Sequence, residues 1–380
     1  MATIDTIPFN RPYVTGAELG YIQEAIDNGH LSGNGPFARR CTEMLEEDLG
    51  APGVLLTHSC TGALEMSALL ADLEPGDEVI MPSYTFSSTA TAFALRRAVP
   101  VFVDVRPDTL NLDERLVEAA ITDRTRVICA VHYAGVGCEL DALADIARRH
   151  SLLLVEDAAQ GFGATYKDRP LGTVGQIGAF SFHETKNISS GEGGALIVND
   201  PALLKRAEIL HEKGTDRRAF FRGQVDKYRW VDVGSSFVVS ELAAAFLWAQ
   251  LERSEWINGQ RMALWSRYHE ALADLESAER LRRPIAPGNV RHNAHLYYLL
   301  MPSEAGRDEL IDHLRVRGIQ AVFHYVPLHS APAGLKLGRA HGDLAVSDSV
   351  SARLLRLPLW VGMRDDDVER VIAGVRSFFA

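Results

Sequence analysis

The stretch Leu152-Leu-Leu-Val-Glu-Asp-Ala-Ala-Gln160 predicts a buried strand that ends in polar side chains. Its apolar residues are consecutive, without the spacing of three and four that marks a helix face. Similar short apolar runs occur elsewhere before residue 200, at Val54–Thr57, Val79–Met81, Val101–Val105, Val127–Val131, Ala179–Phe182 and Ala195–Val198. Uninterrupted runs of this length are typical of strands that are covered on both faces.

Helical patterns separate most of these runs. Ala63, Met66, Leu70 and Leu73 recur at steps of three and four, and Leu140–His150 is similar. Alternation of strands and helices predicts an α/β fold with a mainly parallel, seven-stranded sheet. In such sheets ligands bind at the carboxyl ends of the strands, so residues that follow a strand are candidates for function.

The pattern of predicted helices and strands changes after residue 250. A long helical pattern from Ser240 toward Leu275 is expected to link two lobes. It is followed by a small α+β pattern, with strands and helices expected at His295–Met301, Asp308–Arg317, Ile319–Tyr325 and Asp365–Phe379. We therefore predict a large domain over residues 1–250, including an N-terminal arm, and a small C-terminal domain over residues 251–380.

The charge and composition of the chain exclude some classes of binding partner. The net charge is -11 and no dense Lys/Arg run is present, which argues against nucleic acid or an anionic membrane as partner. The Met1–Asp5 start carries no basic segment followed by an apolar one, and no window approaches the roughly 18 apolar residues of a membrane span. We expect a cytoplasmic protein. The four cysteines show no C-x-x-C spacing, so neither a metal site nor a disulfide framework is predicted.

Lys186 lies between two predicted strands, in Ser181-Phe-His-Glu-Thr-Lys-Asn-Ile-Ser-Ser-Gly-Glu-Gly-Gly194. Near a strand's carboxyl end, a lysine with a lowered pKa can form a Schiff base with an aldehyde cofactor. The alternative is an ordinary solvated loop lysine. The chain offers few other candidate amines, namely Lys167, Lys205, Lys213, Lys227 and Lys336.

Three further groups suit pyridoxal phosphate. Asp157 can pair with the pyridinium nitrogen, and Gln160 can reach the ring hydroxyl, although a carboxylate at a strand end is also often a helix cap or metal ligand. Ser59 is a plausible N-cap, and the N–H groups of the following residues can cradle a phosphate. Phe86 can stack on the pyridine, the alternative being a buried core phenylalanine. The phosphate residues are Cys60, Thr61 and Gly62.

Together these segments resemble a known family. Asp157-Ala-Ala-Gln160, Ser181-Phe-His with Thr185-Lys186-Asn187, Gly191-Glu-Gly-Gly194 and Pro82-x-x-Thr-Phe86 are similar to the DegT/StrS sugar aminotransferases, which are fold-type I enzymes dependent on pyridoxal phosphate. The resemblance runs from about Ile7 to Phe379. It implies that Lys186 is the Schiff-base lysine and proton shuttle, and that Asp157, Gln160, Phe86, Cys60, Thr61 and Ser181 bind the cofactor.

The resemblance also implies substrates and a homodimer. Ile7-Pro-Phe-Asn10, Phe221-Arg-Gly-Gln-Val-Asp-Lys-Tyr228 and Val322-Phe-His-Tyr-Val-Pro-Leu-His329 are most similar to members that aminate C4 of a dTDP-4-keto-6-deoxyhexose with L-glutamate as donor, giving dTDP-4-amino-4,6-dideoxygalactose. His324 and His329 match histidines near the sugar. Ser236 falls where many members have an asparagine that contacts the partner subunit's phosphate.

The cationic segment Lys213–Tyr228 suits a nucleotide diphosphate, with Arg222 and Lys227 as candidate contacts, although a solvated basic loop is the alternative. Action on the 3-keto isomer and a non-catalytic sensor of the same fold stay open. Related 3-dehydratases replace the lysine by histidine, and nicotinamide enzymes need a G-x-G-x-x-G that is absent here. The sequence does not distinguish an axial from an equatorial product amine.

Overall fold

A computed structural model of the chain describes residues 5–380. Residues 1–4, on which the expectation of no targeting segment partly rests, lie outside the described residues. Among the helices of residues 5–380, none has the length and apolar character that a membrane crossing requires. The four cysteines are buried free thiols. The described residues hold no cluster of three His, Cys, Asp or Glu side chains arranged for a metal.

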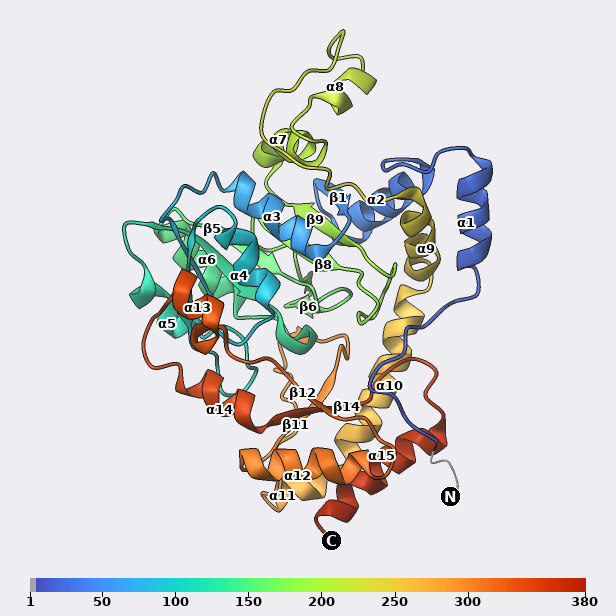
Figure 1. Ribbon diagram of the computed structural model, residues 1–380, viewed down its shortest axis with the longest axis vertical. Helices are drawn as coiled ribbons and strands as arrows, with labels where there is room; N and C mark the ends of the chain where they lie inside the picture. Colours follow the sequence, from blue (N-terminus) through green and yellow to red (C-terminus); the bar gives the residue numbers. More distant parts are fainter. Residues whose placement is uncertain (1–4) are drawn as a thin grey trace.

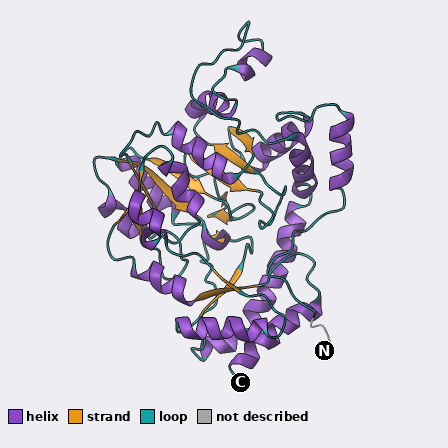
Figure 2. Ribbon diagram, viewed as in Figure 1, coloured by secondary structure: helices purple, strands orange, loops and turns teal. Residues whose placement is uncertain are grey.

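An eight-stranded sheet forms the centre of the larger part of the molecule (Figure 2). In spatial order its strands are β1 (Gly53–Thr57), β9 (Gly194–Val198), β8 (Ile177–Ser181), β5 (Leu153–Asp157), β4 (Thr125–Val131), β2 (Glu78–Pro82), β3 (Val99–Val103) and β13 (Arg339–Ala340). Only β9 runs antiparallel to its neighbours. The prediction of a mainly parallel sheet is therefore confirmed, and all seven expected strands are present.

The predicted strand count needs one correction, because β13 adds an eighth strand at the edge beside β3. It comes from the C-terminal part of the chain, more than 200 positions after β3. A two-residue strand is too short to show any hydrophobic period, so the sequence gives no signal for it.

Helices cover both faces of this sheet, as the buried strands require. Alternate residues of each strand point to opposite faces. One face packs on α2 (Pro36–Leu49), α5 (Glu114–Ala120), α6 (Leu140–Arg149) and α9 (Glu241–Leu251). The other packs on α3 (Cys60–Leu70), α4 (Ser87–Ala94) and α7 (Pro201–His211). Two more helices flank this part of the chain, α1 (Glu18–Asp27) and α8 (Arg217–Phe221).

A second core forms around a three-stranded antiparallel sheet in the order β11 (Tyr297–Leu300), β14 (Leu354–Leu357), β12 (Val322–Phe323). The helices around it are α10 (Ser254–Ala271), α11 (Ala273–Ser277), α12 (Glu304–Arg315), α14 (Ala345–Arg353) and α15 (Asp365–Phe378), gathered at the lower end of Figure 1. Ile7 belongs to this core and its N–H donates to Gly318 O. The remaining elements are α13 (Pro332–Leu337) and a small sheet of β6 (Thr165–Tyr166), β7 (Arg169–Pro170) and β10 (Val290–Arg291).

The expected long helix from Ser240 is wrong, since the chain breaks between α9 and α10 at Glu252 and Arg253. Arg253 has φ -117° and ψ 9°, outside the helical range. Residues of α9 pack on the large sheet, whereas Trp265 and Tyr268 of α10 pack in the second core. We propose that this break, beside the predicted boundary at residue 250, divides the two domains.

Candidate active site

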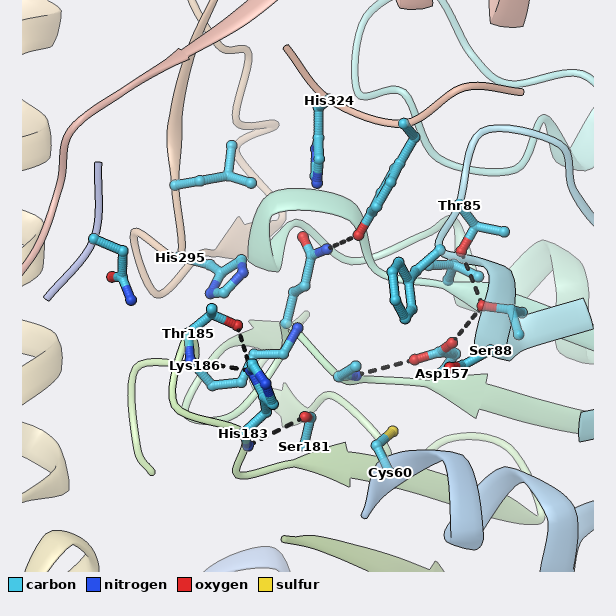
Figure 3. A pocket seen from close by; sticks show the side chains of 18 of the residues that line it. Cys60, Thr85, Ser88, Asp157, Ser181, His183, Thr185, Lys186, His295 and His324 are labelled. Carbon is cyan, nitrogen blue, oxygen red and sulfur yellow. Dashed lines mark hydrogen bonds between the residues drawn. The ribbon is translucent and has the colours of Figure 1, made fainter. Parts of the chain in front are cut away.

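A cavity of about 720 Å³ opens where the parallel strands of the large sheet end. Eight of the predicted site residues line it, namely Cys60, Thr61, Phe86, Asp157, Gln160, Ser181, Lys186 and His324. In Figure 3, Cys60, Asp157, Ser181 and Lys186 lie on the sheet side, and His324 enters from the opposite side. The topology explains this meeting, because β1, β2, β5 and β8 run in one direction and present their carboxyl ends at one edge.

Asp157 is the last residue of β5, and its carboxylate is held at both oxygens. Thr89 Oγ1 donates to Oδ2 at 2.7 Å, and the N–H of Ala159 donates to Oδ1 at 3.2 Å. Because Thr89 gives its only hydroxyl proton to the carboxylate, Thr85, 2.9 Å away, must donate to Thr89. This chain fixes the orientation of a buried carboxylate that still faces the cavity.

Lys186 lies in the irregular loop between β8 and β9, half-buried, with its side chain in the cavity. Its backbone N–H donates to His183 O at 2.9 Å, which anchors the loop independently of the side chain. Burial lowers the pKa of the amine below its ordinary value, while Cys60 and Asp157 act in the opposite direction. A lowered pKa leaves more free amine, which is the form that attacks an aldehyde.

The start of α3 forms the floor of the cavity near Cys60. Ser59 is the predicted N-cap, and its Oγ accepts from Gly62 N at 3.0 Å. Thr61 Oγ1 donates to Ser88 at 2.9 Å. Gly194 lets β9 approach this helix end, because a Cβ there would lie 2.4 Å from Cys60 N. The unpaired N–H groups of this first helical turn are suited to a phosphate.

The hydrogen bonds of the Gln160 side chain determine which of its amide atoms is the oxygen and which the nitrogen. The N–H of Ala134 donates to Oε1 at 2.7 Å, so Nε2 must be the donor that reaches the Tyr325 hydroxyl at 2.9 Å. Phe86 is 58% exposed and lines the cavity, so the alternative of a buried core phenylalanine is wrong. Its ring lies 6.2 Å from that of Tyr325.

Four predicted site residues do not line this cavity. His329 contacts Ser83 instead, with Nδ1 2.7 Å from Oγ. Ser236 is exposed and its backbone pairs with Glu212. Arg222 forms an ion pair with Glu208, and Lys227 is exposed on the same segment. That segment, α8 and the loop after it, projects beyond α7 at the end of the molecule away from α12 and α15 (Figure 1).

His295 is a cavity residue that the sequence analysis did not single out. The Asn187 amide nitrogen donates to Asn258 Oδ1 and to Asn293 O, both at 2.8 Å. Asn187 Oδ1, 3.1 Å from His295 Nδ1, is therefore an acceptor, and the ring carries its proton on Nδ1. Burial lowers the pKa of His295 well below its ordinary value, with Lys186 adding to the effect, so the ring is neutral.

Glu156, the residue before Asp157, supports the strand end from below. It is fully buried, and Oε1 accepts from the N–H groups of Val174 and Gly175, both at 2.7 Å. Oε2 accepts from Gly172 N and from His132 Nε2, both at 2.8 Å. Burial alone would raise the pKa of Glu156, but these hydrogen bonds outweigh burial and lower it.

We expect Glu156→Gln to destabilise the protein, because a carboxamide has one acceptor oxygen for four donors. Each buried donor left without a partner costs about 1 to 3 kcal/mol. Chemical denaturation should therefore show a loss of several kcal/mol, and the exposed Glu43→Gln should show almost none. Because the folded pKa is lowered, this stabilisation is present above the unfolded value of about 4.3 and is lost as the pH falls through the folded pKa. Equal stability of both variants and wild type at pH 7 would contradict this role.

The sequence profile of the DegT/DnrJ/EryC1/StrS aminotransferase family matches residues 12–376. The chain belongs to this family. It is 34% identical over 379 residues to the spore coat polysaccharide biosynthesis protein SpsC of Bacillus subtilis, covering 98% of this chain and 96% of SpsC. The non-catalytic alternative is thereby set aside, because the family and its solved structures are aminotransferases dependent on pyridoxal phosphate.

Solved structures agree over the whole fold. DesV of S. venezuelae, solved with a bound ketimine intermediate, superposes with a TM-score of 0.89 at 32% identity, covering 98% of both chains. The aminotransferase TlmJ of Streptoalloteichus hindustanus superposes with a TM-score of 0.90 at 31% identity, also covering 98% of both chains. A protein of Streptococcus pneumoniae solved in its PLP form superposes with a TM-score of 0.90 at 26% identity over the same shares.

The residues of the cavity fit pyridoxal phosphate. An oriented, buried carboxylate, a lysine with a lowered pKa, a helix start with unpaired N–H groups and an exposed aromatic ring all face one space. Bound there, the cofactor supplies an electron sink for the carbanion left when a proton departs from the amine-bearing carbon. We propose that Asp157 faces the pyridinium, Gln160 the ring hydroxyl, and Cys60, Thr61 and Ser181 the phosphate.

Proposed function

We propose that this aminotransferase moves the amino group of L-glutamate to C4 of a dTDP-4-keto-6-deoxyhexose. The supporting observation concerns which segments of the chain line the cavity. Two of the three segments most similar to the C4 enzymes contribute to it, Phe9 and Asn10 from the first and Val322–Tyr325 from another. The side chains that resemble a sugar site therefore share one cavity with Lys186.

Lys186 has two tasks in this proposal, holding the cofactor and moving protons. With the cofactor bound and carrying the substrate, the free amine of Lys186 would lie beside the carbon that loses or gains a proton. An amine with a lowered pKa can accept that proton in the glutamate stage and return one in the sugar stage. The neutral rings of His295 and His324 keep this part of the cavity free of further titrating cations.

The decisive measurement is the NMR structure of the product formed from dTDP-4-keto-6-deoxyglucose and L-glutamate. A new amine at C4, axial or equatorial, is the expected result. Amination of only the 3-keto isomer would reject the C4 assignment while keeping the sugar aminotransferase. The coupling constants would also assign the configuration, which depends on the face of the sugar that is protonated.

We propose a homodimer in which the segment Lys213–Tyr228 and Ser236 serve the partner's site. The segment exposes large apolar side chains, with Phe221 70% and Tyr228 55% exposed, and Trp230 beside it is 78% exposed. Apolar surface of this kind marks a protein contact. Light scattering should report twice the chain mass of 41.8 kDa. A fully active monomer would reject the shared site.

Arg222→Ala is expected to raise the KM for the sugar nucleotide roughly ten- to a hundredfold. The reason is the loss of one charge-assisted phosphate contact, about 1.5 to 3 kcal/mol. The glutamate half-reaction, followed by the visible absorbance of the bound cofactor, should be nearly unchanged. Equal damage to both half-reactions would show that the segment shapes the cofactor site instead.

A further inference from the structure

Arg356 stands on β14, the central strand of the small sheet. Leu355 and Leu357 on either side pack into the second core with α12 and α15. Because side chains alternate along a strand, Arg356 projects from the opposite face, toward the large sheet. It lines the same cavity as Lys186.

The guanidinium of Arg356 is incompletely bonded. Nη2 donates to Phe323 O at 3.0 Å, and Cζ lies 4.6 Å from the centre of the Phe9 ring. Nε is buried and has no hydrogen-bond partner within residues 5–380. Because Arg356 also lines the cavity, a ligand bound there can supply the acceptor that this buried donor lacks.

No carboxylate of the described chain neutralises this charge. Two carboxylates line the cavity, and both are engaged elsewhere. Asp157 accepts from Thr89 and from the N–H of Ala159, and Glu192 lies 3.7 Å from His183. No ion pair of Arg356 is found among residues 5–380, whereas a carboxylate would match its forked donors.

A second cavity arginine is differently placed. Arg261 donates from Nε to Ala294 O at 3.1 Å and from Nη2 to His295 O at 2.5 Å. Its donors thus hold the backbone that carries His295. Arg356 is the cavity guanidinium whose Nε is still free to bind an anion.

We infer that Arg356 binds a carboxylate of the amino donor. The inference rests on the proposed function, in which an amino acid supplies the nitrogen, and it names the residue that recognises that acid. The carboxylate would accept from Nε and an adjacent Nη, with the Phe9 ring covering the guanidinium plane. The anion is a carboxylate rather than the sugar nucleotide's diphosphate, which the proposal assigns to Arg222 and Lys227.

The test begins with binding, measured by calorimetry on the cofactor-loaded enzyme. Glutarate carries the carboxylates of glutamate without an amine, so it reports recognition apart from turnover. We expect wild type to bind glutarate and Arg356→Gln to bind it roughly ten- to a hundredfold more weakly, the loss of a charge-assisted contact. Arg356→Lys, which keeps the charge without the fork, should lie between them. Arg353→Gln, which removes a guanidinium outside the cavity, should bind as wild type does.

Two further probes separate the explanations. The half-saturating concentration of L-glutamate should rise in Arg356→Gln by the same factor as for glutarate. The reaction of the bound cofactor with methoxyamine, which has no carboxylate, should keep its rate and show that the site is intact. Binding of dTDP should be unchanged.

The proposal is overturned if wild type does not bind glutarate, if Arg356→Gln binds it equally well, or if methoxyamine reactivity or dTDP affinity falls in parallel. Failure of the proposed function looks different. Glutarate binding that depends on Arg356, together with no amination of the sugar nucleotide, would keep this carboxylate site and reject the sugar substrate.

Discussion

Lys186→Ala is expected to abolish turnover and leave a folded protein. The backbone of the loop is held by the N–H of Lys186 on His183 O, a contact that alanine also makes. In the proposed function the lost amine is needed twice, to attach the cofactor and to carry the proton in each half-reaction. A positioned acid/base group alone contributes about a hundred- to ten-thousandfold, so activity should fall by at least the upper figure.

The assignment is checked by mass spectrometry after borohydride reduction of the loaded enzyme. The pyridoxyl label should appear on Lys186 in wild type and be absent from Lys186→Ala. Lys205→Ala, on α7 and away from the cavity, is the matched control and should keep both label and activity. Label on any other lysine would overturn the site assignment.

The predicted strands of the large sheet were accurate because their signal is local. Each is a short apolar run between polar turns, and β5 and β8 end within one residue of an expected site residue. The sequence therefore predicted which residues stand at the strand ends and also that their side chains lie close together in the fold. Asp157, Ser181 and Cys60 meet because parallel strands present their carboxyl ends together.

The elements of the second core were predicted less completely. β12, Val322–Phe323, lies within the strand expected at Ile319–Tyr325, whereas β14 interrupts its leucines with Arg356 and shows no clear period. The break between α9 and α10 contains no glycine or proline, the residues that usually mark the end of a helix in a sequence. It follows from the change of packing partner, from the large sheet to the second core, which is a tertiary property.

The same limit applies to the site. The role of Thr89 could not be predicted from the sequence, because it depends on a contact with Asp157, 68 positions away. His295 and Arg356 enter the cavity from elements that pack on it only after folding. The one available signal was a charged residue inside an otherwise apolar run, Leu354-Leu-Arg-Leu357, because a charged side chain on an apolar strand is a candidate for a ligand site.

Asp157→Asn is expected to keep the cofactor and to lower turnover at least a hundredfold. A neutral amide cannot hold the proton on the pyridinium nitrogen, so the carbanion loses its electron sink. The phosphate contacts that we propose at the start of α3, and the proposed attachment to Lys186, do not involve this side chain. The defect should therefore lie in kcat, with the visible absorbance of the bound cofactor still present.

The fold should accept this substitution because the neighbours of Asp157 can adapt. Asparagine can keep its oxygen on the N–H of Ala159 and turn its amide nitrogen toward Thr89, whose hydroxyl can accept as well as donate. Thr89→Val is the matched variant, since it leaves the carboxylate and removes only the bond that orients it. We expect Thr89→Val to lose roughly five- to thirtyfold, corresponding to about 1 to 2 kcal/mol. Near-normal turnover of Asp157→Asn would mean that another group faces the ring nitrogen. If Thr89→Val lost as much activity as Asp157→Asn, the orientation of the Asp157 carboxylate would matter more than its charge.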